Sequence, residues 1–431
     1  MTRRPRAVVV VTGSELVRGE RTDRNGPFLA GEALRYGLEP ARITIVGDAP
    51  AELEAALREA LKADACLVSG GLGPTHDDRT VELLARAAGM ELVVDEALER
   101  EIESISRAVA ERLRRPYADF APGVTKQARR PVSAVSIGLA GTAPGLVFRA
   151  PTGCVVVVLP GPPGELRRLW PNAVASEPMR ELLDGTRPPG RRVLRLFGVS
   201  ESAVARALEG AGGDGEGVEA TICAREFEIH VDLMVEPGAE ARAEALDLAL
   251  AERLEQWLFA RDERRVEELV LSLAAARGLR LATAESCTGG MVAARLTDVP
   301  GSSASFLGGI VAYADDVKRT ELGVPDELLA EHGAVSAEAA AAMAEGARER
   351  LGADVAVAVT GIAGPGGGTP EKPVGLVYLH VAGPDGSLRR VLDLPGEREQ
   401  IRMRATVTAL HLLRALLLGS HDEAVQRPRL A

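Results

Sequence analysis

The 431-residue chain has few of the residues that build disulfides and metal centres. Its four cysteines lie far apart in the sequence and form no CxxC pair. Its six histidines form neither an HxxH nor an HExxH motif. These absences argue against disulfides, against a zinc–thiolate site and against a metal site built from histidines.

Long apolar runs and an excess of positive charge are missing as well. No run approaches the roughly 18 apolar residues that a membrane span needs. The apolar run at residues 7–11 is too short for a signal peptide, so we expect a cytoplasmic protein without a membrane partner. The net charge of −11 argues against direct nucleic-acid binding, which needs a basic face.

The chain contains three regions with distinct patterns. In residues 7–170, apolar strands at 8–11, 42–46 and 65–68 alternate with helices at 25–36, 51–60 and 81–88. This alternation predicts a parallel sheet covered on both faces, with ligands at the carboxyl ends of its strands. Residues 191–259 follow a β-α-β-β-α order that predicts a small α+β domain ending in a long helix at 240–258. The region from residue 266 onward alternates again, and the fold class is therefore α/β.

The last region carries polar residues at the predicted strand ends. An apolar strand at 306–314 ends in Tyr313, and Asp315 then caps a short helix that carries Lys318. A buried strand at 353–359 runs into a glycine-rich loop that begins at Thr360. A hairpin at 374–382 and 389–394 and a helix at 397–418 complete this region.

A glycine loop at residues 69–80 follows the third strand. It lacks the Gly-Lys-Ser/Thr ending of a Walker motif and the third glycine of a dinucleotide fingerprint. Its glycines would let backbone N–H groups approach a phosphate, and Asp77 and Asp78 could carry a divalent cation. The alternative is a solvated turn in which an aspartate caps the next helix.

The stretch at residues 281–296 predicts a strand, a tight turn with Ser286 and Thr288, and a helix that opens at Gly289 and Gly290. The N–H groups after Ser286 could hold an anion or a developing oxyanion. The simpler interpretation is a serine or threonine that caps the helix.

Polar residues at the ends of neighbouring strands favour a catalytic role for this turn. Ser286, Tyr313 and Thr360 could converge at one edge of a parallel sheet. A serine needs a base, and because no histidine lies in these stretches, a buried, neutral Lys318 is the candidate. The alternatives are packing for Tyr313, a surface charge for Lys318 and a turn at Thr360–Gly361.

Taken together, these motifs resemble the CinA (competence/damage-inducible) family over nearly the whole chain. The resemblance implies a MoaB/MogA-like, molybdopterin-binding type of domain at 1–175, a small KH-like α+β domain at 190–260 and a nicotinamide-nucleotide amidase domain at 264–420. The residues that carry it are Gly13–Leu16, Val46–Asp48, Gly70–Asp78, Gly141–Gly145, Leu159–Gly161, Gly198–Ser202, Ala284–Gly290, Tyr313 with Lys318, Gly333–Ser336 and Thr360–Gly368.

For the last domain, the resemblance implies cofactor-free hydrolysis of nicotinamide mononucleotide to nicotinate mononucleotide and ammonia. Ser286 would be the nucleophile, with Tyr313 and Lys318 as the activating and proton-shuttling pair. The substrate would contact the serine turn, the Thr360 loop and an arginine at its phosphate. These binding residues would be Thr288, Gly289, Gly290, Thr360, Gly361 and Arg402.

For the first domain, the resemblance allows a second activity, the metal-dependent hydrolysis of ADP-ribose. Gly70, Gly71, Gly73 and Thr75 would bind the nucleotide phosphates, and Asp48, Asp77 and Asp78 would hold the divalent metal. The family's domain plan also implies a homodimer. The alternative function is a non-catalytic nucleotide-binding or regulatory protein linked to competence and DNA repair.

Overall fold

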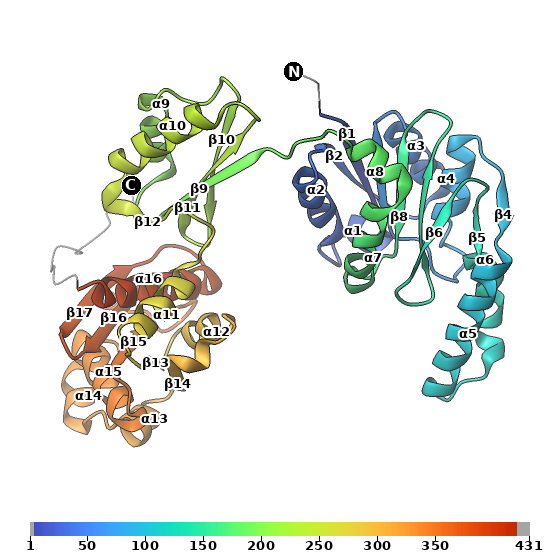
Figure 1. The fold of residues 1–431 in the computed structure, drawn as a ribbon. Helices are drawn as coiled ribbons and strands as arrows, with labels where there is room; N and C mark the ends of the chain where they lie inside the picture. Colours follow the sequence, from blue (N-terminus) through green and yellow to red (C-terminus); the bar gives the residue numbers. More distant parts are fainter. Residues whose placement is uncertain (1–3, 420–431) are drawn as a thin grey trace. The chain divides into compact units, whose positions relative to one another are not determined.

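In the computed structural model, which describes residues 4–419, the chain divides into two compact units at Pro189/Gly190 (Figure 1). The first unit holds a six-stranded sheet, and the second holds a four-stranded and a five-stranded sheet. The small α+β region and the C-terminal α/β region both lie within the second unit, and their division into two domains stays a prediction. No helix within residues 4–419 is both long and apolar enough to cross a membrane.

The sheet of the first unit has the order β2-β1-β3-β8-β7-β6. Its four parallel strands are β1 (Arg6–Thr12), β2 (Glu39–Val46), β3 (Ala65–Ser69) and β8 (Val155–Leu159), which confirms the predicted parallel sheet. The strands β6 (Val135–Leu139) and β7 (Pro144–Arg149) extend it antiparallel.

Successive side chains of a strand point to opposite faces of the sheet. Because apolar side chains therefore lie on both faces, helices cover both. Val8 and Val10 pack in one core with α3 (Pro50–Ala60) and α4 (Thr80–Ala88). Val9 and Val11 pack in another with α2 (Asn25–Arg35), α7 (Pro163–Ala175) and α8 (Glu177–Leu183). The helix α1 (Ser14–Val17) follows β1 directly.

An arm that the sequence analysis did not anticipate lies between α4 and β6. It consists of β4 (Leu92–Val94), α5 (Glu96–Leu113), η1 (Tyr117–Asp119), α6 (Ala121–Gln127) and β5 (Arg129–Pro131). The strands β4 and β5 pair with each other, and α5 and α6 share a small apolar core. In Figure 1, α5 projects away from the six-stranded sheet.

The four-stranded sheet has the order β10-β11-β9-β12 and packs on α9 (Glu201–Gly210) and α10 (Glu240–Arg253). Its strands are β9 (Gly190–Leu196), β10 (Val218–Arg225), β11 (Glu228–Val235) and β12 (Leu258–Ala260). The prediction of one helix over 240–258 was wrong. The helix ends at Arg253, η2 (Glu255–Trp257) follows, and Leu258 pairs with Leu196 of β9.

The five-stranded sheet, of order β14-β13-β15-β16-β17, is mixed rather than largely parallel. The strand β13 (Leu281–Glu285) pairs in parallel with β14 (Phe306–Val311) and β15 (Val355–Gly361). The predicted hairpin, β16 (Leu376–Gly383) and β17 (Gly386–Asp393), adds antiparallel strands. The strand β14 ends at Val311, three residues earlier than predicted, so Tyr313 follows the strand.

Helices also cover both faces of this sheet. One core contains residues of α11 (Val266–Ala276), α12 (Met291–Thr297) and α16 (Arg398–Leu417). The other contains α13 (Asp315–Leu322), α14 (Asp326–His332) and α15 (Ala337–Leu351) against the alanines of β13 and β15. The short η3 (Ser302–Ala304) precedes β14. The α/β fold class is confirmed, and it places the carboxyl ends of β13, β14 and β15 at one edge.

Candidate functional site

The predicted convergence of three strand ends in the C-terminal sheet is present. Glu285, the last residue of β13, is in register with Val311 of β14 and Val359 of β15. The N–H of Ser286 donates to the carbonyl of Val359 at 2.9 Å, and the N–H of Ala312 donates to the carbonyl of Glu285 at 2.8 Å. Ser286, Tyr313 and Thr360 therefore follow three adjacent strands at the same edge of the sheet.

Glu285 holds the helix that follows the serine turn. Its buried carboxylate accepts hydrogen bonds from the N–H groups of Gly290 (3.0 Å), Val292 (3.0 Å) and Ala293 (2.8 Å). These are N–H groups at the start of α12, which otherwise lack an intrahelical acceptor. A serine or threonine cap for this helix was therefore the wrong interpretation: neither Ser286 nor Thr288 caps it.

The same contacts restrict which N–H groups could bind an oxyanion. The N–H of Gly289 donates to the carbonyl of Ser286 at 3.1 Å, and that of Gly290 is bound to Glu285. Within residues 4–419, the N–H groups of Cys287 and Thr288 donate to no acceptor. The N–H groups that are open to an oxyanion thus lie directly after Ser286, whereas those of Gly289 and Gly290 are already hydrogen-bonded.

The side chains around Ser286 favour an oxygen nucleophile. Ser286 is 8% exposed, and its hydroxyl makes no hydrogen bond to another described residue. Burial raises the pKa of the neighbouring Cys287 thiol to about 12, so this thiol stays protonated at neutral pH and is a poor nucleophile. The hydroxyl of Thr288, which is fully buried, has no hydrogen-bond partner within the described chain.

Lys318 is buried, as expected, and has two acceptors. Its Nζ donates to the main-chain carbonyl of Tyr313 at 3.3 Å and to the carboxylate of Asp315 at 3.3 Å. Asp315 is the first residue of α13 and not its N-cap, which is Ala314. No hydrogen bond joins Lys318 or Tyr313 to the Ser286 hydroxyl in the described residues, although such catalytic bonds often tighten only when substrate is bound.

Tyr313 is 59% exposed and is held by an arginine that the sequence analysis did not select. Arg398, at the start of α16, donates to the Tyr313 hydroxyl at 2.8 Å and to the carbonyl of Gly364 at 2.7 Å. This guanidinium links Tyr313 to the glycine-rich loop after β15. The buried Thr360 donates its hydroxyl proton to the carbonyl of Ala334 at 2.7 Å, so it holds the segment before α15. Gly361 lies against Val377 of β16.

Arg402, one turn after Arg398, holds the serine turn itself. Its Nε donates to the carbonyl of Cys287 at 3.0 Å, and its Nη2 donates to the carbonyl of Thr288 at 2.8 Å. The planar guanidinium presents several N–H donors in a fixed geometry, which matches the two consecutive carbonyl acceptors of this turn. The guanidinium predicted to bind the substrate phosphate thus has a structural role in the turn that carries Ser286.

The glycine loop of the first unit has the open backbone donors expected of a phosphate site. Gly70 and Gly71 follow β3, and the N–H groups of Gly71, Leu72 and Gly73 donate to no acceptor within the described chain. A Cβ atom at Gly71 (φ +65°) would lie 2.1 Å from the hydroxyl oxygen of Thr80. Only glycine allows this approach. The Thr80 hydroxyl is buried and has no partner among the described residues.

The three aspartates predicted to hold a metal do not form one ligand set. Asp48 accepts hydrogen bonds from the hydroxyls of Thr12 (3.0 Å) and Ser14 (2.6 Å) and from the N–H of Ser14 (3.0 Å). Asp77 and Asp78 both accept from Thr75, which is thereby part of the loop's internal bonding. The Thr75 hydrogen bond lowers the pKa of Asp77. In residues 4–419, no group of three or more His, Cys, Asp or Glu side chains is arranged to hold a metal ion.

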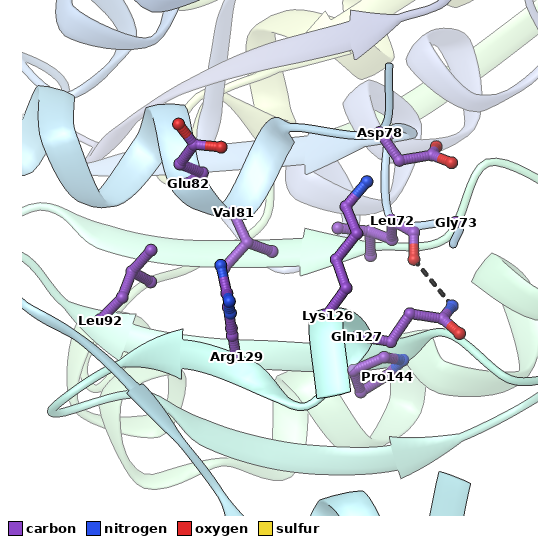
Figure 2. A pocket seen from close by; sticks show the side chains of 11 residues that line it. Leu72, Gly73, Asp78, Val81, Glu82, Leu92, Lys126, Gln127, Arg129 and Pro144 are labelled. Carbon is purple, nitrogen blue, oxygen red and sulfur yellow. Dashed lines mark hydrogen bonds between the residues drawn. The ribbon is translucent and has the colours of Figure 1, made fainter. Parts of the chain in front are cut away.

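A hollow that is open to solvent lies beside this loop (Figure 2). The arm forms one wall, and Figure 2 shows Lys126 and Gln127 of α6 reaching toward the loop. Gln127 Nε2 donates to the carbonyl of Leu72 at 2.9 Å, and Lys126 donates to the carbonyl of Thr75. Arg129 of the arm and Glu82 of α4 also line the hollow, so the cationic groups that the arm adds are Lys126 and Arg129.

Comparisons with known proteins cover both regions. The CinA C-terminal domain matches residues 263–417, and a family described as "Probable molybdopterin binding domain" matches residues 8–179. A CinA-like protein of Mycobacterium sp. (strain MCS) is 46% identical over 421 residues, which is 96% of this chain and 99% of that protein. The chain belongs to the CinA family. A CinA-like protein of Mycobacterium tuberculosis (strain ATCC 25177 / H37Ra) is 44% identical over 426 residues, 96% of this chain and 98% of that protein.

Solved structures of CinA-family proteins are similar to part of the chain. The competence/damage inducible protein CihA from Agrobacterium tumefaciens is 45% identical, with a TM-score of 0.35, and covers 37% of this chain and 99% of its own. A CinA superfamily protein from Klebsiella pneumoniae is 35% identical, with a TM-score of 0.35, and the match covers 36% of this chain and 99% of that protein. The two domain matches and the full-length relatives confirm the predicted CinA family and its MoaB/MogA-like first domain.

Four residues at the candidate sites of this CinA protein were given no role in the sequence analysis: Glu285, Arg398, Lys126 and Gln127. Glu285 had a signal: it is an acidic residue just before a helix start, where a carboxylate is favourable. Arg398 also had one, because residues four apart lie on one face of a helix and Arg402 was already a candidate. The arm residues Lys126 and Gln127 had none, because their contact with the glycine loop spans 51 and 55 residues of sequence.

Proposed function

We propose that the C-terminal domain hydrolyses the carboxamide of nicotinamide mononucleotide to give nicotinate mononucleotide and ammonia, with Ser286 as nucleophile. The observation that carries this proposal is the serine turn. Ser286 stands at the shared edge of three strands, and the two N–H groups directly after it have no acceptor in the described chain. Such a pair can stabilise the oxyanion of acyl transfer. The reaction requires no cofactor.

In the first step, the Ser286 Oγ attacks the carboxamide carbon, and the carbonyl oxygen becomes an oxyanion facing the N–H groups of Cys287 and Thr288. The carbon–nitrogen bond then breaks, and the nitrogen leaves as ammonia with the proton that Ser286 gave up. Water attacks the resulting ester, which releases the nicotinate carboxyl group and restores the serine hydroxyl.

Tyr313 and Lys318 are the candidates to move that proton. The Tyr313 hydroxyl accepts a hydrogen bond from Arg398, which leaves its own proton available to a second partner. To accept a proton, Lys318 has to act as a neutral amine, which donates one hydrogen bond to the Asp315 carboxylate at 3.3 Å and keeps its lone pair for the proton. We assign the Ser286 proton a path through Tyr313 to Lys318, which gives a proton to the departing nitrogen. The intact set of three residues favours an enzyme over a binding protein, which has no need of it.

The test is ammonia release from nicotinamide mononucleotide by wild type, Ser286→Ala and Ser272→Ala. Ser272 is an exposed serine of α11 whose hydroxyl donates to the Glu268 carbonyl in its own helix, so it serves as the matched control. We expect ammonia from wild type and Ser272→Ala only. With hydroxylamine present, the acyl-enzyme should also yield the hydroxamate of the mononucleotide.

Two results would overturn the proposal. If Ser286→Ala released ammonia at the wild-type rate, Ser286 would not be the nucleophile. If wild type bound the mononucleotide, measured by calorimetry, but released no ammonia, the alternative of a non-catalytic nucleotide-binding or regulatory protein would replace the enzyme.

We further propose that the first domain binds the phosphates of a nucleotide such as ADP-ribose. Three consecutive N–H groups without an acceptor in the described chain, the buried Thr80 hydroxyl and the nearby Lys126 support this proposal. Hydrolysis of ADP-ribose with and without a divalent metal tests it. The arrangement of Asp48, Asp77 and Asp78 gives no support for one shared metal site, so no step is assigned to a metal. The homodimer stays a prediction.

A further inference from the structure

The hairpin of β10 and β11 turns through two residues with an unfavourable backbone. Glu226 has φ +50° and Phe227 has φ +70°, in the left-handed region that glycine and asparagine normally occupy in such turns. A bulky residue there is strained, and strain of this kind persists only where the surroundings require the side chain. The contacts of the Glu226 and Phe227 side chains show which neighbours keep these residues in the strained conformation.

The hairpin tip, residues 226–228, contacts two helices of the C-terminal domain. Glu226 forms an ion pair at 3.0 Å with Arg295 of α12. The Phe227 ring lies 5.4 Å from the guanidinium of Arg404 of α16 and 6.1 Å, edge to face, from the Phe197 ring. The tip therefore contacts both α12, through Glu226, and α16, through Phe227.

Glu228 provides the third and most buried contact. Its Oε1 accepts a hydrogen bond from Nε2 of His411 of α16 at 2.7 Å, and both side chains are about 5% exposed. The His411 ring stacks on Phe197 with a centroid distance of 3.8 Å. A carboxylate buried this deeply is costly unless it is hydrogen-bonded. The bond to His411 thus fixes where α16 lies against the hairpin.

Both helices that the tip holds carry the serine turn. The first turn of α12 is bound to Glu285, the residue before Ser286. Arg402 of α16 donates two hydrogen bonds to the turn itself, and Arg398 donates one to Tyr313. The path from the hairpin tip to the nucleophile therefore consists of two rigid helices and a few hydrogen bonds.

We infer that the hairpin tip of the small middle domain is a positioning element for the amidase site, with Phe227 and Glu228 as positioning residues that act through α16. The inference rests on the proposed function. A nucleophile displaced by as little as about 1 Å can lose on the order of a hundredfold in rate. Changes at the tip should consequently lower kcat without weakening substrate binding.

The decisive variant is Phe227→Gly in the full-length chain. Glycine relieves the strained φ while removing the ring, so the melting temperature should stay within about 3 °C of wild type. The kcat for ammonia release should nevertheless fall about fivefold or more, with KM within about twofold. A purely structural role predicts instead that kcat follows the melting temperature.

A second test compares the variants Glu228→Ala and Glu228→Gln. The alanine variant should lose about tenfold or more in kcat, and glutamine, which keeps an acceptor for His411, should restore most of it. The control is Glu219→Ala, an exposed glutamate of β10 away from the tip, with unchanged kinetics. If circular dichroism shows that Glu228→Ala is unfolded, the inference is tested with Phe227→Gly alone.

The outcomes separate the two proposals. Wild type without ammonia release refutes the amidase and, with it, this inference. Active wild type with kcat unchanged in Phe227→Gly refutes the inference alone. An increase in KM without a change in kcat also refutes it, because the tip would then act on substrate binding.

Discussion

Replacing Glu285 by glutamine tests whether one carboxylate organises the serine turn. In the structure, two carboxylate oxygens accept three backbone N–H groups at 2.8–3.0 Å, and the side chain is 1% exposed. Glutamine has nearly the same shape but only one accepting oxygen. Its NH2 group would therefore face at least one N–H group of Gly290, Val292 or Ala293.

The expected cost follows from counting these bonds. One buried N–H group without an acceptor costs about 1–3 kcal/mol, and each of two remaining bonds loses about 0.5–1 kcal/mol of charge assistance. Relief from burying a charge offsets part of this sum, so we expect a loss of about 3 kcal/mol. For a unit of this size, each kcal/mol lowers the melting temperature by roughly 2–4 °C, which gives about 6–12 °C.

Scanning calorimetry of the full-length protein measures the effect. The chain divides at Pro189/Gly190, so the transition of the first unit serves as an internal reference. Glu349→Gln, at an exposed position of α15, is the matched control and should leave both transitions in place. A shift below about 2 °C in Glu285→Gln would show that the three hydrogen bonds do not hold α12.

Three further predictions follow from named contacts. Arg402→Lys cannot keep both hydrogen bonds to the serine turn and should lower kcat roughly tenfold or more at nearly constant KM; a rise in KM alone in steady-state kinetics would instead support phosphate binding. Native protein should react with a thiol reagent such as DTNB at one cysteine, Cys223, and at all four after denaturation, because the other three are buried; a second fast native thiol would contradict this. Burial lowers the pKa of His411 below its usual 6.5, and for Glu228 the hydrogen bonds from His230 and His411 outweigh burial and bring its pKa to about 2. In both cases the unfolded state binds more protons, so stability should fall as the pH drops below about 6.5, where His411 is protonated on unfolding, and further between about 4.5 and 2, where Glu228 is. The urea midpoint of unfolding should decline over this pH range, and it should decline less steeply in His411→Gln.

Most elements could be predicted from local patterns. The buried strands β3 and β15 are apolar except at their carboxyl ends, Ser69 and Thr360–Gly361, as expected of strands covered on both faces. The position of Ser286 and Thr360 at one sheet edge followed from the rule that carboxyl ends of neighbouring parallel strands lie together. The error at β12 has a physical reason: three residues form a strand there because Leu258 pairs with Leu196, about sixty residues earlier in the chain.

The functional roles depended more on tertiary structure. Arg402 was predicted at the substrate phosphate, but it binds the turn 115 residues earlier in the sequence, and no local pattern indicates that contact. The three aspartates of the first domain were predicted as one metal site, yet each is hydrogen-bonded within its own neighbourhood.

The sequence alone determined the family, the α/β class and the strand ends at which the candidate chemistry lies, because periodicity and motif order are local properties of the chain. Only the tertiary structure decided which N–H groups remain open at Ser286, that Glu285 holds α12, and that the hairpin tip contacts α12 and α16. These features depend on how side chains distant in sequence pack together, and packing is specified by the whole fold rather than by any one segment.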